Sequence, residues 1–209
     1  LVEKRYINGT SDTEFSPFKM ISRAELAAVM LRMLNKMDNT LECGFSDVTK
    51  YDWYYYVAES SAKEGLINGF SDGTFHGNEN ITKEQLIAVL ARVLQSKNHT
   101  SVPDITLNYR DGVSPWAEDF VKIAKSEGIL NEYADNTYGG SGFVTRGYVA
   151  VMLMRTYNKI KDKLEYPSFI GENAVPEPMP TPAPKKIIVL DAGHGKDSGY
   201  MNDDEKRSE

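Results

Sequence analysis

Cysteine is almost absent from the sequence, with Cys43 the single one among 209 residues. One thiol excludes an internal disulfide framework and a cysteine-rich zinc ribbon. Long apolar runs are missing too, and without about 18 consecutive apolar residues no segment is expected to cross a membrane as a helix. Basic residues number 24 against 30 acidic ones, for a net charge of −6, and they form no cluster. This charge pattern argues against nucleic acid as the main partner.

The sequence does contain an internal repeat. Residues 5–25 match residues 65–85 at an offset of 60, and residues 128–148 match residues 65–85 at an offset of 63, with no gap in either stretch. A fixed period of this length indicates tandem structural units that pack on one another. The positions shared by two copies include Ile7/Ile67, Asn8/Asn68, Gly9/Gly69, Asp12/Asp72, Asn68/Asn131, Asp72/Asp135 and Thr82/Thr145.

A leading helix is predicted before the loop of each complete copy. The segments Trp53–Glu64 and Trp116–Glu127 have helical patterns, and Gly65 and Gly128 suit the position that ends a helix. Only Leu1–Lys4 precede the first loop. The first copy is therefore expected to lack its leading helix, and the chain to begin inside a repeat.

A second helix is predicted after each loop, because apolar residues follow at helical spacing behind an S/T-x-x-E/Q capping box. We therefore predict a mainly α fold of three tandem helix–loop–helix repeats, at residues 1–38, 39–97 and 98–157. The boxes are Ser22/Glu25, Thr82/Gln85 and, with only its first half kept, Thr145/Tyr148.

These motifs resemble the signature of the S-layer homology family, which runs F-x-D-V, W-A, G-(I/L)-I-x-G, D-G-T-F and I-T-R-A-E. The resemblance covers about residues 5–157. The segments that carry it are Phe45-Ser46-Asp47-Val48, Trp53, Gly65-Leu66-Ile67-Asn68-Gly69, Asp72-Gly73-Thr74-Phe75 and Ile81-Thr82-Lys83-Glu84-Gln85 in the second copy, Ile21-Ser22-Arg23-Ala24-Glu25 in the first, and Pro103-Asp104-Ile105, Trp116-Ala117 and Val144-Thr145-Arg146-Gly147-Tyr148 in the third.

The resemblance implies a pseudo-threefold helical module that binds secondary cell-wall polysaccharide of Gram-positive bacteria without a covalent link. In that family the sugar is often pyruvylated and therefore anionic. The implied location is extracellular, at the bacterial cell wall. A single cysteine fits an exported protein that folds without disulfides, and we expect that Leu1 is not the natural start.

Three cations occupy the first position inside their predicted helices: Arg23, Lys83 and Arg146. A cation is unfavourable there, because the helix dipole and the free N–H groups attract anions. Together with those N–H groups, however, a guanidinium forms a good carboxylate site. We therefore predict that these cations contact an acidic ligand, and the alternative is an internal ion pair with a loop aspartate.

Polar and aromatic residues before the leading helices are further candidates. Asp47 and Asp104 either bond sugar hydroxyls or cap the chain locally. Trp53 and Trp116 either stack on a sugar ring or belong to the hydrophobic core, which is the commoner place for a tryptophan at the start of an amphipathic helix.

Glycines in the loops are the last candidates for the polysaccharide site. Gly9 and Gly69 allow either the close approach of a ligand or a left-handed turn. The third copy has Glu132 at this position, and an acid would repel an anionic sugar. The third groove is therefore expected to bind weakly or differently.

After the repeats the sequence changes character. Residues 158–185 contain five prolines at alternate positions from Pro176 to Pro184, which is typical of a stiff, extended linker. Residues 186–209 then open with a β-branched run that predicts a buried strand. That run, Ile187-Ile188-Val189-Leu190-Asp191-Ala192-Gly193-His194-Gly195, resembles the start of the zinc-dependent N-acetylmuramoyl-L-alanine amidases.

This second resemblance implies the first strand of a truncated α/β amidase domain, with His194 as its first zinc ligand and peptidoglycan as its substrate. Catalytic zinc needs about three protein ligands and an open position for water, and no histidine follows His194. Zinc is therefore expected for the full amidase domain, whereas this chain alone is predicted to hold none stably and to be inactive. The alternative parents are a non-catalytic S-layer or surface protein and a different cell-wall enzyme, such as a peptidase.

Overall fold

The computed structural model describes residues 6–11, 13–130 and 136–164, all within the first of two units into which the chain divides, Leu1–Glu177. The second unit, Pro178–Glu209, lies outside the described residues. So do the proline-rich run, the predicted amidase strand and His194, and these stay predictions.

The described residues fold into five α-helices and one short 3-10 helix, with no strand among them, which confirms the mainly α prediction for this part of the chain. No helix in it is long and apolar enough to cross a membrane. The leading helices start two residues later than predicted and end one residue earlier. The elements are α1 (Arg23–Leu34), α2 (Tyr55–Lys63), α3 (Lys83–Asn98), α4 (Glu118–Ser126), α5 (Arg146–Ile160) and η1 (Lys161–Lys163).

Capping fixes where the long helices begin. The side chains of Ser22 and Thr82 each accept the N–H of the third helical residue, and each donates its own backbone N–H to the side chain of that residue, so both predicted capping boxes form. Thr145 accepts the N–H of Tyr148, which is the half box expected for α5. Arg23, Lys83 and Arg146 are thus the first helical residues, as predicted.

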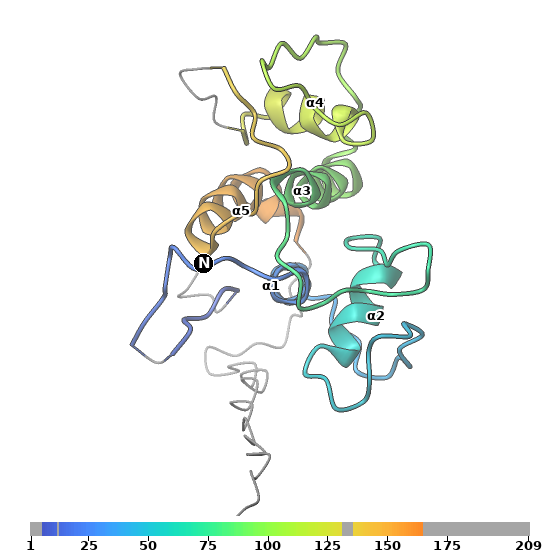
Figure 1. The fold of residues 1–209 in the computed structure, drawn as a ribbon. Helices are drawn as coiled ribbons and strands as arrows, with labels where there is room; N and C mark the ends of the chain where they lie inside the picture. The colour runs from blue at the N-terminus through green and yellow to red at the C-terminus, as the bar shows by residue number, and fades with distance from the viewer. Residues whose placement is uncertain (1–5, 12, 131–135, 165–209) are drawn as a thin grey trace, which may run out of the picture. The chain divides into compact units, whose positions relative to one another are not determined.

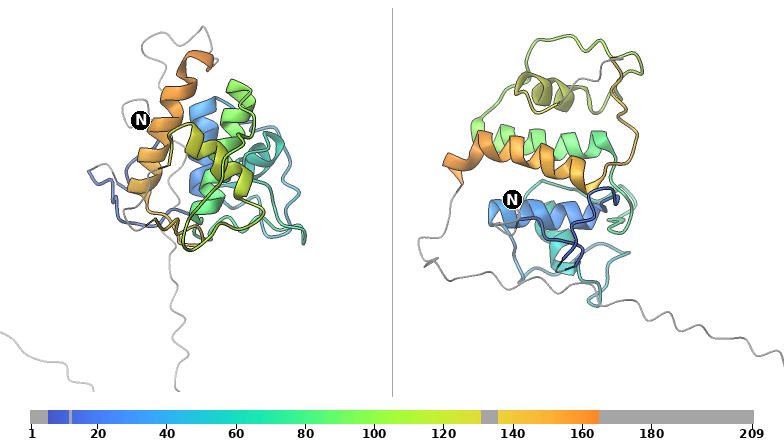
Figure 2. Two further views of the ribbon diagram at one scale, coloured as in Figure 1. Left: turned by 90° about the horizontal axis from the view of Figure 1, so that it is seen from above. Right: turned by 90° about the vertical axis from the view of Figure 1, so that its left-hand side faces the viewer.

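The second helices of the three repeats, α1, α3 and α5, run side by side, and the leading helices lie outside them (Figures 1 and 2). The leading helix α2 of the second repeat packs on α1 of the first repeat, and α4 of the third repeat packs on α3 of the second. Each leading helix therefore covers the preceding repeat, so the core is built between repeats and not inside each one.

A ring of backbone hydrogen bonds ties the three repeats together where α1, α3 and α5 begin. The N–H of Ile81 donates to the carbonyl of Ile21 at 3.1 Å, that of Val144 to Ile81 at 3.2 Å, and that of Ile21 to Val144 at 3.3 Å. All three side chains are buried. The closed cycle gives the module an approximate threefold order.

Candidate binding groove between repeats

Each first-turn cation reaches into the loop of another repeat. Arg23 donates from Nε to the carbonyl of Phe75 at 3.0 Å and from Nη2 to the carbonyl of Asn68 at 3.1 Å. Its guanidinium lies 4.7 Å from the ring centroid of Phe70, a cation–π distance. Only 5% of Arg23 is exposed.

The other two cations make the same kind of contact in turn. Lys83 donates to the carbonyl of Tyr138 in the third repeat and lies 4.6 Å from the centroid of that ring. Arg146 donates from Nε to Phe15 at 3.1 Å and from Nη2 to Asn8, in the loop of the first repeat. The first repeat thus holds the second, the second holds the third, and the third holds the first.

Neighbouring loops also use the N–H groups at the start of the helices. The backbone N–H of Arg23 donates to Glu79 at 2.9 Å, that of Lys83 to Gly142 at 2.9 Å, and that of Arg146 to Lys19 at 2.8 Å. These donors are not available to an anion, contrary to the sequence argument. The alternative of an ion pair with a loop aspartate does not describe these contacts either, because the bonds go to backbone carbonyls.

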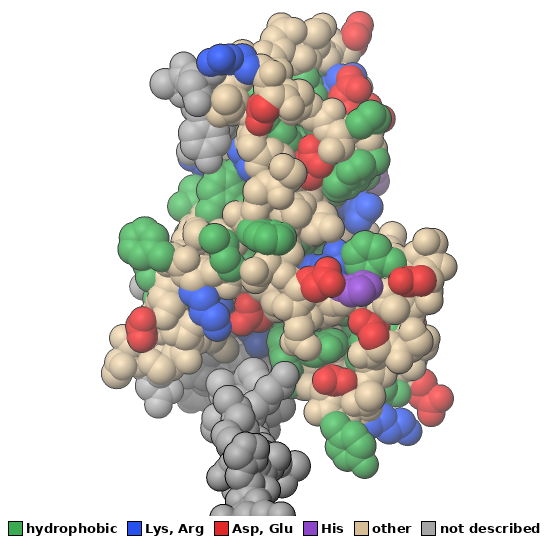
Figure 3. All heavy atoms as spheres, in the orientation of Figure 1, with side chains coloured by type: hydrophobic (Ala, Val, Ile, Leu, Met, Phe, Trp, Pro, Cys, Tyr) green, Lys and Arg blue, Asp and Glu red, His purple; other side chains and the backbone are tan. Residues whose placement is uncertain are grey.

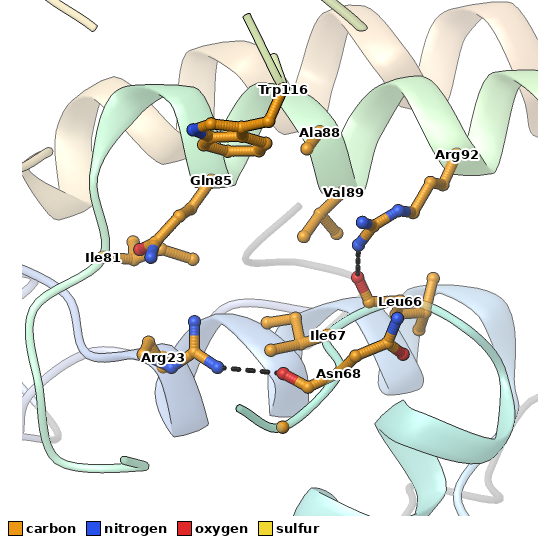
Figure 4. Close-up of a pocket in the computed structure, with 11 residues that line it drawn as sticks. Arg23, Leu66, Ile67, Asn68, Ile81, Gln85, Ala88, Val89, Arg92 and Trp116 are labelled. Atoms are coloured by element: carbon orange, nitrogen blue, oxygen red, sulfur yellow. Dashed lines mark hydrogen bonds between the residues drawn. The ribbon is translucent and has the colours of Figure 1, made fainter. Parts of the chain in front are cut away.

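A pocket of about 200 Å³ lies beside Arg23, between the second-repeat loop and α3 (Figure 4). We call it the α3 groove. Its wall combines the first turn of α1, the loop after α2, one face of α3 and Trp116 just before α4, so all three repeats contribute. The lining residues are Arg23, Leu66, Ile67, Asn68, Gly69, Ile81, Gln85, Ala88, Val89, Arg92 and Trp116.

The charge of the α3 groove is positive. Of the described residues that line it, Arg23 and Arg92 are cations and none is an acid. Burial lowers the pKa of both guanidiniums, and for Arg23 the nearby carboxylates of Glu79 and Asp47 oppose that shift. Arginine stays protonated in proteins even so. The groove is therefore a local cationic site on a chain whose net charge is −6.

Donors are available inside this groove. Arg23 uses Nε and Nη2 for the loop, and its remaining nitrogen, Nη1, points toward the open space (Figure 4). Arg92 uses Nη1 to bond the carbonyl of Leu66 at 2.9 Å. Gln85 accepts the N–H of Thr82 through Oε1, which leaves its amide NH₂ as a donor.

Trp116 forms the upper wall of the groove in Figure 4, and 53% of it is exposed. Trp53, the equivalent residue before α2, is half-buried and meets Tyr54 edge-on at 5.5 Å. The exposure of Trp116 argues against the core alternative for that residue, whereas Trp53 packs on the buried Tyr54 and both of its alternatives stay open. Trp116 presents an aromatic face to whatever occupies the groove.

Asp47 holds the second-repeat loop, with its carboxylate accepting the N–H groups of Phe75 at 2.7 Å and His76 at 2.8 Å. Burial would raise the pKa of Asp47, but these backbone bonds outweigh it and lower the pKa. In the third repeat the equivalent contacts, to Tyr138 and Gly139, belong to Asp111. Asp104, which the sequence paired with Asp47, is exposed and lies elsewhere.

The two loop glycines are needed for packing inside the loop. A Cβ on Gly69 would lie 2.2 Å from the ring of Phe45, and one on Gly9 would lie 2.5 Å from the carbonyl oxygen of Ser11. Neither has a positive φ, so the left-handed-turn alternative is wrong. Gly69 also lines the α3 groove, whereas Glu132 lies outside the described residues.

Sequence reasoning missed Arg92 and Gln85 as groove residues. A signal was present, because Arg32, Arg92 and Arg155 recur at the repeat offsets of 60 and 63. Arg155 donates to the carbonyl of Ile129 at 2.7 Å, which repeats the bond from Arg92 to its loop. A basic residue that recurs in every copy indicates a repeated contact, as the first-turn cations do.

Comparison with known proteins agrees with this architecture. Residues 1–27, 44–87 and 110–147 match the family described as S-layer homology domain. The chain is 32% identical over 157 residues to an amylopullulanase of Thermoanaerobacterium thermosulfurigenes, and 31% identical over 157 residues to the exoglucanase XynX of Acetivibrio thermocellus. It is 25% identical over 173 residues to the surface-layer 125 kDa protein of Lysinibacillus sphaericus.

These matches cover most of this chain and little of the relatives. They span 73%, 73% and 79% of the chain, but only 8%, 14% and 14% of the three relatives in the same order. What is shared is therefore one module within much longer proteins.

Proposed function

The chain belongs to the S-layer homology domain family, and from that premise we propose that it anchors its parent protein non-covalently to an anionic polysaccharide of the bacterial cell wall. The observation that carries the proposal is the α3 groove, where two guanidiniums and an exposed tryptophan face a pocket that no acid of the described part lines. Relatives named a surface-layer protein and a cell surface glycoprotein support the cell surface as its location.

In this proposal the sugar ring stacks on Trp116, whose π face favours the polarised C–H groups of a sugar. A carboxylate on the sugar, such as a pyruvyl group, receives charge-assisted bonds from Nη1 of Arg23 and from Arg92. Gln85 donates its amide to a hydroxyl. Arg23 thus makes one contact with the ligand instead of a two-pronged fork, because its other donors hold the loop.

The remaining sequence candidates take different parts. Lys83 and Arg146 hold the loops of the third and first repeats, where we propose grooves equivalent to the α3 groove. Asp47 and the two loop glycines shape the loops themselves. Trp53 is proposed as the stacking residue of the groove on α1. We propose that Asp104 contacts sugar outside these grooves, because it does not line the α3 groove.

Gln85→Glu tests the proposal without disturbing the fold. Glu25 occupies the same position in α1, and its carboxylate completes the same capping box by accepting the N–H of Ser22 at 2.9 Å. The variant therefore adds one negative charge to the groove and keeps the helix start. We expect its affinity for purified wall polysaccharide to fall about tenfold at low salt, which corresponds to about 1.4 kcal/mol.

The matched control is the same polymer with its carboxylates reduced to alcohols. With that neutral polymer Gln85→Glu loses only the hydrogen bond from the Gln85 amide to a sugar hydroxyl and suffers no charge repulsion, so its loss of affinity should be clearly smaller than with the native polymer. Equal affinity of both proteins for the native polymer would rule out an anionic ligand in the α3 groove.

We also propose that the parent is a zinc-dependent N-acetylmuramoyl-L-alanine amidase acting on peptidoglycan. Two observations support this proposal. Residues 187–195 resemble the start of those amidases, and relatives named as enzymes contain the same repeat module. Across the described residues no three His, Cys, Asp or Glu side chains gather as a metal site. His194 lies outside those residues, and zinc stays an expectation for a full amidase domain around it.

The coding sequence downstream of Glu209 tests the parent's identity. A glutamate and a further histidine in amidase context would support the enzyme. A long repetitive region would favour a structural surface protein, and the signature of another hydrolase would favour a different wall enzyme.

A further inference from the structure

A second pocket, of about 140 Å³, lies where α1 and α2 end, against the last two turns of α3. We call it the helix-end pocket. Leu34, Leu66 and Val93 form its apolar wall, and all three are buried. Three cations against one acid give the rest of the lining an excess of two positive charges. Its polar and charged residues are Lys36, Arg92, Lys97, Glu64 and Ser96.

The two lysines of the helix-end pocket have no partner in the part of the chain that the structure describes. Neither ammonium group donates a hydrogen bond or forms an ion pair there, and the exposed Glu64 pairs with neither of them. Arg92 uses Nη1 to bond the carbonyl of Leu66 (Figure 4). Positive charge in this pocket is therefore not neutralised by the surrounding described residues.

This gathering of unpaired cations is local. On the face of the molecule drawn in Figure 3, basic side chains lie scattered among acidic ones. The equivalent junction between the second and third repeats differs too, because Ile160 there is uncharged and buried and Glu127 pairs with Lys159 at 3.4 Å. A packing role common to all repeats therefore does not account for the lysines. By the repeat offsets, Lys36 corresponds to Ser96, Lys97 to Ile160 and Glu64 to Glu127.

A competing role for a lysine near a helix end is to bond the free carbonyls of the last turn. Backbone donors already fill that role beside this pocket. The N–H of Lys36 donates to the carbonyl of Leu31 at the end of α1, and the N–H of Gly65 donates to that of Ala62 at the end of α2, both at 2.9 Å. The ammonium groups therefore remain available to a ligand.

We propose that the helix-end pocket binds a phosphoryl group. Donors from separate elements suit the several oxygens of a tetrahedral oxyanion, and lysine binds phosphate as a point charge. A planar carboxylate is better matched by a free guanidinium fork, but Arg92 has one prong on the carbonyl of Leu66. The two excess positive charges also match a phosphomonoester, which carries about −1.5 to −2 at neutral pH. This inference goes beyond the proposed function, because it needs no polysaccharide in the α3 groove.

Titration of the full chain with inorganic phosphate, followed by amide NMR at constant ionic strength and neutral pH, tests the proposal. We expect saturable shifts of the amides around Lys36 and Lys97. Lys36→Gln and Lys97→Gln should each weaken binding about tenfold, since each removes a nearby positive charge. Lys50→Gln, at an exposed lysine that lines neither pocket, is the control and should bind like the wild type. Glu64→Gln should tighten binding several-fold, because it removes the opposing charge.

Four results would overturn the proposal. They are the absence of saturable shifts, equal affinity of the three lysine variants, shifts that centre on Gln85 and so place the anion in the α3 groove, and acetate binding as tight as that of phosphate. Glucose 1-phosphate and a glycerol phosphate polymer distinguish the sources of the group. Tightest binding of the inorganic ion would identify free phosphate, of the monoester a phosphorylated sugar, and of the polymer a phosphodiester chain. Polysaccharide is absent from these titrations, so their failure is distinct from failure of the proposed function.

Discussion

Arg23 donates a hydrogen bond of 3.0 Å from Nε to the backbone carbonyl of Phe75, 52 positions along the chain. The N–H of the same Phe75 donates to Asp47. The backbone of this one loop residue is therefore held at its carbonyl by a cation of the first repeat and at its N–H by an acid of the second. The first-turn cation of each repeat therefore serves mainly to connect that repeat to another, and contact with a ligand is its second role.

Arg23→Leu should lower the free energy of unfolding by about 3 kcal/mol. The variant loses two charge-assisted bonds and leaves the buried carbonyl of Phe75 and the part-buried carbonyl of Asn68 without these donors. Urea unfolding followed by far-UV circular dichroism measures this. Arg110→Leu, at an exposed arginine, is the control and should stay within about 0.5 kcal/mol. Equal stability of the two variants would refute the fastening role.

Gly69→Ala should destabilise the module by about 1 to 3 kcal/mol, the usual cost of overpacking. The added Cβ would lie 2.2 Å from Phe45 and 2.7 Å from the carbonyl of Thr74, and backbone cannot move aside cheaply. Gly44→Ala is a matched control because nothing lies within 4 Å of its Cβ and its φ is not positive. Thermal unfolding should separate the two variants, and a neutral Gly69→Ala would contradict the packing argument.

Asp111 should contribute to acid sensitivity. Hydrogen bonds from the N–H groups of Tyr138 and Gly139 lower the pKa of its carboxyl. A lowered folded-state pKa means that its stabilisation is fully present above the unfolded pKa, about 3.9, and is lost as the pH falls through the lower folded value. Asp111→Asn should therefore flatten the stability profile below about pH 4.

Asp104→Asn provides the comparison for that experiment, because Asp104 is exposed and the N–H groups of Tyr138 and Gly139 donate to Asp111. Its acid-side profile should follow the wild type. If Asp104→Asn flattens the profile and Asp111→Asn does not, then the pairing of Asp47 with Asp111 is wrong.

Local features of the fold were predictable from the sequence, because they depend on residues close together in the chain. The capping boxes at Ser22 and Thr82 are an example. The partners of Arg23 were not predictable in this way, since they lie in another repeat. The sequence paired Asp104 with Asp47, but the structural counterpart of Asp47 is Asp111. Asp111 lies 64 residues after Asp47, whereas the two tryptophans are 63 residues apart, so a fixed offset of 63 does not align the two aspartates.

Trp116→Ala should weaken binding to wall polysaccharide about tenfold while leaving stability nearly unchanged. The residue is 53% exposed, so its removal opens no cavity, but it takes away the aromatic wall of the α3 groove. Tyr51→Ala removes a fully exposed aromatic ring outside the groove and should bind like the wild type. Sedimentation with purified wall sacculi compares the two, and equal loss in both would exclude a specific stacking role.

Glu25→Gln should have the opposite effect on the groove of α1. By the repeat offsets Glu25 corresponds to Gln85, Arg32 to Arg92 and Arg146 to Arg23. In the groove proposed on α1, the negative charge of Glu25 would therefore oppose an anionic sugar. Glutamine keeps the capping box, as Gln85 does in α3, and the lost ion pair to Lys19 is long at 4.0 Å and partly exposed, so it contributes little to stability.

The measurement is calorimetric titration with the charged polymer in the Trp116→Ala background, where the α3 groove is weakened and the α1 groove dominates. Affinity should rise several-fold at low salt, and the gain should shrink at about 1 M salt, where charges are screened beyond about 3 Å. With the carboxyl-reduced polymer Glu25→Gln should change nothing. A gain that survives both high salt and loss of the carboxylates would show that charge is not the cause. No gain at low salt would exclude the α1 groove as a site for an acidic sugar.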